Sequence, residues 1–149
     1  MKTIIAVWHG GNKGKSQVIR NLANVLLSTY PTATQIFPIL PSTISASGDF
    51  TLVLNVNGKI VGLESQGDPG TNLQGRLVNL CKTYNCYVII CSTRTRGETV
   101  SAVEHIRVSY GHEIIWTSTY QIDNPARHSV VNLLKANHIH ELLVALRRI

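Results

Sequence analysis

Short apolar runs alternate with amphipathic segments along the chain, and this alternation restricts the fold more than any other feature. Runs such as Thr3–Trp8 and Cys86–Cys91 have the length and composition of buried strands. Between them, apolar residues recur at helical spacing, as Val18, Leu22 and Leu26 do. Strands that alternate with helices form a mostly parallel sheet with helices on both faces. We therefore expect one α/β domain over residues 1–149, a three-layer αβα fold with a mostly parallel sheet.

Turn residues place the remaining elements. Asn57-Gly58 separates two apolar runs and predicts an antiparallel hairpin, because both residues tolerate positive φ. Pro38 limits the run Thr34–Leu40 to an edge strand. The expected strands are 3–8, 34–40, 50–56, 59–63, 86–91 and 112–117. The expected helices are 14–30, 72–85, 100–110 and 126–148, the last with a weak point near Asn137.

The composition permits a substantial core and gives the chain a basic character. Hydrophobic residues make up 44% of the chain and charged residues 15%, which argues against disorder. Lys and Arg total 14 against 8 Asp and Glu, a formal net charge of +6. Such a charge attracts polyanions, which fits a phosphate-binding enzyme and also fits a nucleic-acid partner. Because the basic residues are scattered along the chain, the sequence leaves both interpretations open.

The cysteines and the hydropathy pattern favour a cytoplasmic protein that does not enter a membrane. The three cysteines form no Cys-x-x-Cys pair, which is typical of free thiols in a reducing compartment. The apolar run before His9 is too short for the core of a signal peptide. No apolar stretch approaches the roughly 18 residues that a membrane-spanning helix needs. We expect Cys81 and Cys91 to pack in the core, together with Trp8 and Trp116, which end strands.

The segment His9–Ser16 lies directly between the first expected strand and the first expected helix. Its sequence HGGNKGKS has the spacing G-x-x-x-x-G-K-S/T, with His9 at the position of the first glycine. Glycines let several backbone N–H groups face one phosphate, and the start of the helix adds partial positive charge. Lys15 would reach the β- and γ-phosphates, and the Ser16 hydroxyl would bind Mg²⁺. The expected phosphate-binding residues are His9, Gly10, Gly11, Asn12, Lys13, Gly14, Lys15 and Ser16, with His9 bonding a phosphate or fixing the turn.

This strand–loop–helix unit resembles the P-loop NTPase superfamily closely, and the rest of the chain resembles it in layout. Gly10-Gly11 and Gly14-Lys15-Ser16 are also similar to the doubled-glycine loop of chromosome-partitioning and related ATPases. Those loops carry a lysine before the glycine pair and are one residue shorter, whereas this chain has His9 there. The resemblance implies a P-loop fold that binds a nucleoside triphosphate with Mg²⁺. ATP is the expected nucleotide, because the guanine-reading motif Asn-Lys-x-Asp is absent.

Two acids follow the apolar run Ile60–Leu63, at the edge of the sheet where ligands bind in α/β folds. A phosphoryl-transfer site needs a carboxylate that holds the Mg²⁺ shell or orients the attacking water. We expect Glu64 to bind the metal together with Ser16, in a place that resembles the second signature of the superfamily. Asp68 either acts in catalysis or caps the helix that begins near Asn72.

Arg94 and Arg96 lie on the polar loop that follows the strand Cys86–Cys91. They would stabilise charge on the transferred phosphoryl group or bind a second anionic substrate. In the superfamily, an arginine in such a place resembles a phosphate-sensing or lid arginine. The alternative is that one or both are solvated or pair with Glu98.

These residues predict an enzyme that hydrolyses a nucleoside triphosphate or transfers its γ-phosphoryl group to a small acceptor. The expected catalytic residues are Lys15, Glu64, Asp68, Arg94 and Arg96. The alternative from another class is a non-hydrolysing module that uses the same basic edge to hold a nucleotide or nucleic acid. A third reading is a subunit whose nucleotide site is completed by a partner or by a second copy of the chain.

Overall fold

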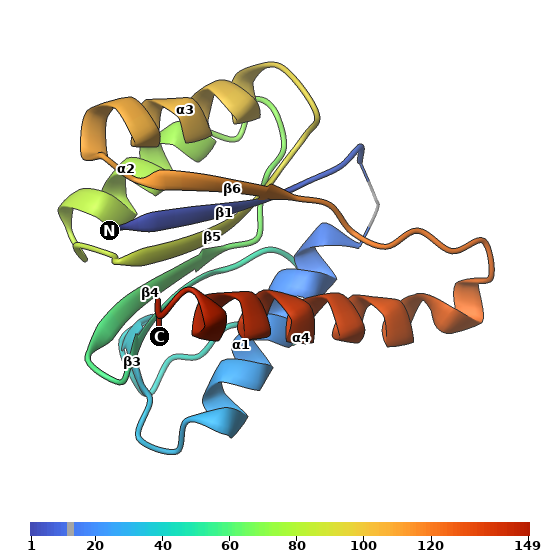
Figure 1. The fold of residues 1–149 in the computed structure, drawn as a ribbon, viewed down its shortest axis with the longest axis horizontal. Coiled ribbons are helices and arrows are strands. Elements are labelled where there is room, and N and C mark those ends of the chain that lie inside the picture. The colour runs from blue at the N-terminus through green and yellow to red at the C-terminus, as the bar shows by residue number, and fades with distance from the viewer. Residues whose placement is uncertain (12–13) are drawn as a thin grey trace.

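In the computed structural model, which describes residues 1–11 and 14–149, six strands form one mixed sheet (Figure 1). The strands are β1 (Thr3–Trp8), β2 (Thr34–Phe37), β3 (Thr51–Val56), β4 (Lys59–Glu64), β5 (Val88–Thr93) and β6 (Glu113–Thr117). Their order across the sheet is β2-β3-β4-β5-β1-β6. The expected parallel sheet is confirmed for β4, β5, β1 and β6, whereas β2 and β3 pair antiparallel at one edge.

The antiparallel edge begins at the hairpin that the sequence predicts. Asn57 and Gly58 have φ values of 52° and 81°, and they join β3 to β4 with Val56 opposite Lys59. The same register places Thr51 opposite Glu64. The beginning of β3 therefore lies at the same edge of the sheet as the ends of the parallel strands.

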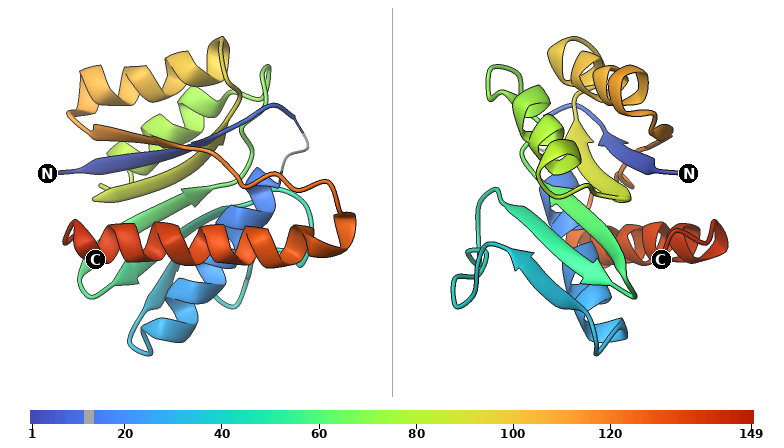
Figure 2. Two further views of the ribbon diagram at one scale, coloured as in Figure 1. Left: turned by 45° about the vertical axis from the view of Figure 1, so that its right-hand side comes forward. Right: turned by 90° about the vertical axis from the view of Figure 1, so that its left-hand side faces the viewer.

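Helices cover both faces of the sheet (Figures 1 and 2). The helices are α1 (Lys15–Thr29), α2 (Leu73–Lys82), α3 (Glu98–Tyr110) and α4 (His128–Ala145), with a 3₁₀ turn η1 at Pro125–Arg127. One buried cluster lies under α1 and α4 and includes Leu22, Leu26 and Ile139. The other lies under α2 and α3 and includes Leu77 and Ile106. Among the described residues, no helix is both long and apolar enough to cross a membrane.

The prediction of a weak point near Asn137 is wrong, because α4 continues through that residue. Ala136 and Ile139 on either side of it are buried against the sheet. Their packing outweighs the low helix propensity of a single asparagine. The last helix is therefore one rigid element that reaches from the C-terminal end of the sheet back along α1.

The predicted burial holds for the cysteines and fails for the tryptophans. Cys81 and Cys91 are buried and free, as expected. Trp8 and Trp116 are 38% and 36% exposed, so their assignment to the core is wrong. Both residues lie near the ends of their strands, where they line a cleft together with Thr95 and the half-buried Val100 of α3.

Candidate functional site

The side chain of Lys15 is buried at the point where β1 ends and α1 begins. Its ammonium donates hydrogen bonds to the carbonyl oxygens of His9 (2.8 Å), Gly10 (3.2 Å) and Thr93 (2.8 Å). Among the described residues, no carboxylate lies within ion-pair distance of this ammonium. Burial and the nearby Arg94 guanidinium lower the pKa of Lys15 to about 8. Among the described residues, the hydrogen-bond partners of this positive charge are therefore neutral carbonyl oxygens, and the Asp68 carboxylate opposes the pKa shift without an ion pair.

The loop around this lysine has one position that requires glycine, Gly14, and a second glycine, Gly11, that lies against an arginine side chain. Gly14 has φ 79°, and a Cβ there would lie 2.7 Å from the Asn132 side-chain oxygen of α4. At Gly11 a Cβ would lie 2.7 Å from Nη1 of Arg94. The loop is therefore packed between α4 and the arginine that follows β5.

The His9 side chain takes part in the turn, which is one of its two expected roles. The ring Nδ1 of His9 accepts a hydrogen bond of 2.8 Å from the backbone N–H of Gly10. The backbone N–H of His9 donates to the carbonyl oxygen of Thr93 at 3.2 Å. The ring therefore fixes the turn that starts the loop. Asn12 and Lys13, also expected to bind phosphate, lie outside the described residues.

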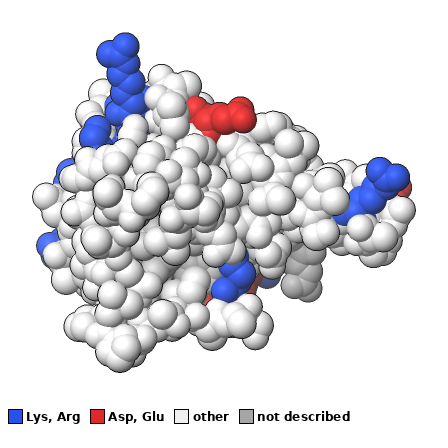
Figure 3. Space-filling view, turned by 90° about the horizontal axis from the view of Figure 1, so that it is seen from below, with Lys and Arg blue, Asp and Glu red and all other residues white. Residues whose placement is uncertain are grey.

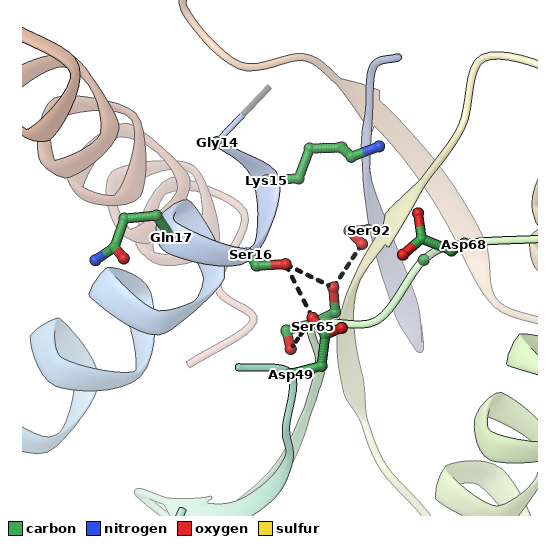
Figure 4. Close-up of a pocket in the computed structure, with 9 residues that line it drawn as sticks. Gly14, Lys15, Ser16, Gln17, Asp49, Ser65, Asp68 and Ser92 are labelled. Atoms are coloured by element: carbon green, nitrogen blue, oxygen red, sulfur yellow. Dashed lines mark hydrogen bonds between the residues drawn. The ribbon is translucent and has the colours of Figure 1, made fainter. Parts of the chain in front are cut away.

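A polar cavity of about 410 Å³ opens beside Lys15 (Figure 4). The Ser16 hydroxyl lies 3.1 Å from Oδ1 of Asp49 and 3.1 Å from the carbonyl oxygen of Ser65. Ser65 in turn lies 3.2 Å from the same Asp49 oxygen and accepts a bond of 2.7 Å from Ser92 at its carbonyl. Hydroxyl, carbonyl and carboxylate oxygens are the donors that Mg²⁺ prefers. The cavity is lined by Gly14, Lys15, Ser16, Gln17, Asp49, Ser65, Gly67, Asp68 and Ser92.

Glu64, the expected metal ligand, does not line this cavity. Its carboxylate is 1% exposed and accepts hydrogen bonds from Thr51 Oγ1 (2.5 Å) and from the N–H of Gln66 (3.2 Å). Nε of Arg76 on α2 lies 3.2 Å from it. Burial raises the pKa of Glu64, although Thr51 and Arg76 oppose this shift. Glu64 thus joins β4 to β3 and α2, on the face of the sheet away from α1.

Asp68 and Arg94 come together at the rim of the cavity. Nε and Nη2 of Arg94 lie 3.1 and 2.8 Å from Oδ1 of Asp68, and both side chains are partly exposed. The capping role considered for Asp68 is wrong, because Asn72 caps α2 through a 3.2 Å bond from Gly75. Asp68 therefore lines the cavity while it forms a partly exposed ion pair with Arg94, and a ligand in the cavity can reach its carboxylate.

The second arginine of the loop is not part of this group. Arg96 is exposed and forms no ion pair within the described part of the chain. Its expected alternative partner, Glu98, instead accepts a hydrogen bond of 3.1 Å from the N–H of Gly70. On the face shown in Figure 3, lysine and arginine side chains lie apart, with uncharged surface between them. Arg96 is therefore an exposed cation with no ion pair in residues 1–11 and 14–149, and it does not line the cavity.

Sequence reasoning missed Asp49 and Asn132. The sequence-based prediction considered only residues that follow the C-terminal ends of strands as ligand-binding residues, whereas Asp49 precedes the beginning of β3. The signal was nevertheless present, because an antiparallel hairpin at Asn57-Gly58 brings the start of β3 beside the end of β4. No comparable signal marks Asn132, whose approach to Gly14 depends on how α4 packs against α1.

Gly67 provides a test of how tightly the cavity wall is built. A Cβ at Gly67 would lie 1.9 Å from the carbonyl oxygen of Ser92, so the loop after β4 must move if a side chain is added. We expect Gly67→Ala to lower the free energy of unfolding by about 1–3 kcal/mol. Gly10→Ala is the matched control, since a Cβ at Gly10 would meet no atom within 4 Å. Equal denaturation midpoints for the two variants would contradict this close approach.

Known proteins do not identify the chain. No family model, no curated protein and no solved structure matches it. The residues around Lys15 and the cavity beside it are therefore the basis for assigning a function.

Proposed function

We propose that the chain binds a nucleoside triphosphate, expected to be ATP, through the loop His9–Ser16, and hydrolyses it or transfers its γ-phosphoryl group to a small acceptor. The observation that carries this proposal is the buried Lys15 ammonium, whose hydrogen-bond partners in residues 1–11 and 14–149 are all carbonyl oxygens. A buried cation without a counter-ion favours an anionic ligand, because the ligand supplies the missing charge. The start of α1 adds the partial charge of its free N–H groups at the same place.

The layout of the elements supports a P-loop NTPase-like fold. The strand that carries the loop lies inside the parallel part of the sheet, between β5 and β6. Helices lie on both faces of the sheet, which supports the proposed three-layer arrangement. Ligands in such folds bind at the carboxyl edge of the strands, and the cavity beside Lys15 lies at that edge.

The cavity also fits a magnesium ion. Ser16 and Asp49 would hold the ion or its water shell, since both present oxygen atoms to the cavity. When bound, Mg²⁺ neutralises charge on the phosphate oxygens. Across residues 1–11 and 14–149, no three His, Cys, Asp or Glu side chains form a metal cluster, so the ion would depend on the nucleotide for further ligands.

Arg94 and Asp68 would act at the transferred group. The Arg94 guanidinium lies against the loop at Gly11 and is held by Asp68. From this position it would stabilise negative charge on the γ-phosphoryl group. Asp68 lines the cavity and would orient the attacking water or acceptor hydroxyl.

A second candidate function is a module that binds a nucleotide or nucleic acid without hydrolysis. The position of Glu64 favours it, because this carboxylate is bonded to Thr51 and Arg76 and does not face the cavity. Turnover would then depend on Asp68 or Asp49, or on a residue from a partner or second copy. Phosphate release measured together with binding separates the two functions.

Replacement of Lys15 tests the proposal directly. We expect Lys15→Ala to weaken triphosphate binding by at least about tenfold, because a charge-assisted contact to phosphate is lost. Isothermal titration with ATP and GTP, with and without Mg²⁺, measures the change. Lys82→Ala, at an exposed position on α2, is the control for loss of charge alone. If Lys15→Ala binds the triphosphate with wild-type affinity, the loop is not the phosphate-binding site.

The pKa of Lys15 gives a second, independent expectation. Burial lowers this pKa to about 8, so the ammonium loses its proton as the pH rises through that value. Only the protonated form attracts phosphate. The contribution of Lys15 to the affinity for ATP should therefore be complete below about pH 8 and fall above it, by at most about tenfold per pH unit. Titration calorimetry across this range should show the decline in the wild type and none in Lys15→Ala.

Asp49 and Glu64 can be separated by a pair of conservative variants. Asp49 is exposed and faces Ser16, so Asp49→Asn should reduce the Mg²⁺ enhancement of ATP binding about tenfold, with little change in unfolding free energy. Glu64→Gln should keep that enhancement and lower the unfolding free energy by about 1–3 kcal/mol, because Arg76 loses its charged partner. The opposite pattern would make Glu64 the metal ligand.

A further inference from the structure

The only two tryptophans of the chain form one wall of an apolar cleft at the carboxyl edge of the sheet. The rings of Trp8 on β1 and Trp116 on β6 lie with their centroids 6.0 Å apart, at 68° to each other. Thr95 and Val100 complete the lining, and the cleft has a volume of about 250 Å³. We call these four residues the tryptophan cleft.

The exposure of the two rings is unusual for this part of the sheet. The β1 residues Ile5, Ala6 and Val7 are fully buried, whereas the next residue, Trp8, is 38% exposed. Trp116 is exposed to a similar extent on the neighbouring strand. Aromatic surface that stays open in a concave place is typical of a binding site, because a ligand removes it from water.

The loop that borders the cleft supplies polar and charged groups. Thr95 lies in the lining, and the next residue, Arg96, is an exposed cation without an ion pair in the described residues. Apolar aromatic surface beside a hydroxyl, with an exposed guanidinium one residue further along the loop, suits a planar ring joined to an anionic group. The sequence contains no run of basic residues that would follow the backbone of a nucleic-acid strand.

The size of the cleft limits what it can hold. Pockets for whole drug-sized ligands are about 300–1,000 Å³, so a cleft of about 250 Å³ suits a single ring system. The rest of the ligand would extend over the loop towards Arg96. Because the two indole rings already touch edge to face, a ligand ring would stack on an exposed face rather than insert between them.

We propose that the tryptophan cleft binds the base of a nucleoside monophosphate, with the phosphate at Arg96. This ligand is separate from the triphosphate at Lys15, and its binding does not depend on the function proposed above. The two sites are reached from successive residues of one loop, since Arg94 bonds to Asp68, which lines the cavity, and Thr95 lines the cleft.

Tryptophan fluorescence, excited selectively over the tyrosines, tests this proposal, because both tryptophans of the chain lie in the cleft. AMP, GMP, CMP and UMP are titrated into the wild-type protein, with ribose 5-phosphate as the probe that lacks a base. We expect saturable quenching by at least one monophosphate and none by the sugar phosphate. Arg96→Ala should weaken the quenching by at least about tenfold. Arg107→Ala, which removes an exposed arginine of α3, should leave it unchanged.

Single-tryptophan variants show where the ligand lies. In Trp116→Leu, with Trp8 as the reporter, the affinity for the monophosphate should fall. Trp116→Phe should restore part of it, because a phenyl ring can still stack on a base. Wild-type affinity in Trp116→Leu, in a protein with an unchanged circular dichroism spectrum, would overturn the proposal.

Lys15→Ala distinguishes this proposal from the previous one. Monophosphate quenching that persists in this variant supports a separate site, whether or not the wild type binds ATP. Quenching lost together with ATP binding would mean that the rings report a nucleotide held at Lys15, which overturns the proposal. The tryptophan-cleft proposal is also overturned if no monophosphate quenches the fluorescence. The same conclusion follows if an oligothymidylate binds more tightly than every monophosphate, or if the fluorescence changes only when the protein self-associates.

Discussion

The contact of the Lys15 ammonium with three carbonyl oxygens determines how the centre of this molecule is arranged. It joins the end of β1 to the end of β5, because two of the carbonyls follow β1 and the third belongs to Thr93. The loop before α1 is thereby closed around a cation, and the pKa of that cation is lowered by its burial. Lysine is suited to this position, since its three N–H donors match three carbonyl oxygens and its charge remains for an anion. Gly11, Gly14 and Arg94 all pack around the closed loop.

The antiparallel strand β3 gives the site its second component. A fully parallel sheet would bring only strand ends to the edge where ligands bind. The hairpin at Asn57-Gly58 reverses the chain, so the residue before β3, Asp49, lies beside Ser16 and Ser65. The carboxylate in the cavity therefore comes from the start of a strand. Glu64, at the end of β4, serves instead to hold α2 through Arg76.

Much of this arrangement could be predicted from the sequence, and the failures have physical causes. Apolar runs and helical spacing locate the strands and helices, and glycine spacing locates the loop around Lys15. The direction of the Glu64 side chain could not be predicted, because successive residues of a strand face opposite sides and the sequence does not say which side α1 covers. Asp68 and Asn72 both have the chemistry of a helix cap, and only backbone geometry decides between them. Trp8 continues an apolar run in the sequence, but β1 extends beyond the helices that cover it, so Trp8 is partly exposed.

The position of β1 in the sheet has a consequence for the order in which the molecule forms. Both neighbours of β1 come from the second half of the chain, since β5 and β6 span residues 88–93 and 113–117. Asn132, which packs against Gly14, follows later still. During synthesis, the loop around Lys15 therefore emerges early and stays without its supports until most of the chain has been translated. Contacts of such long sequence separation slow folding. A nascent chain would consequently form local structure such as the β3–β4 hairpin before the loop around Lys15 acquires its contacts with β5 and α4.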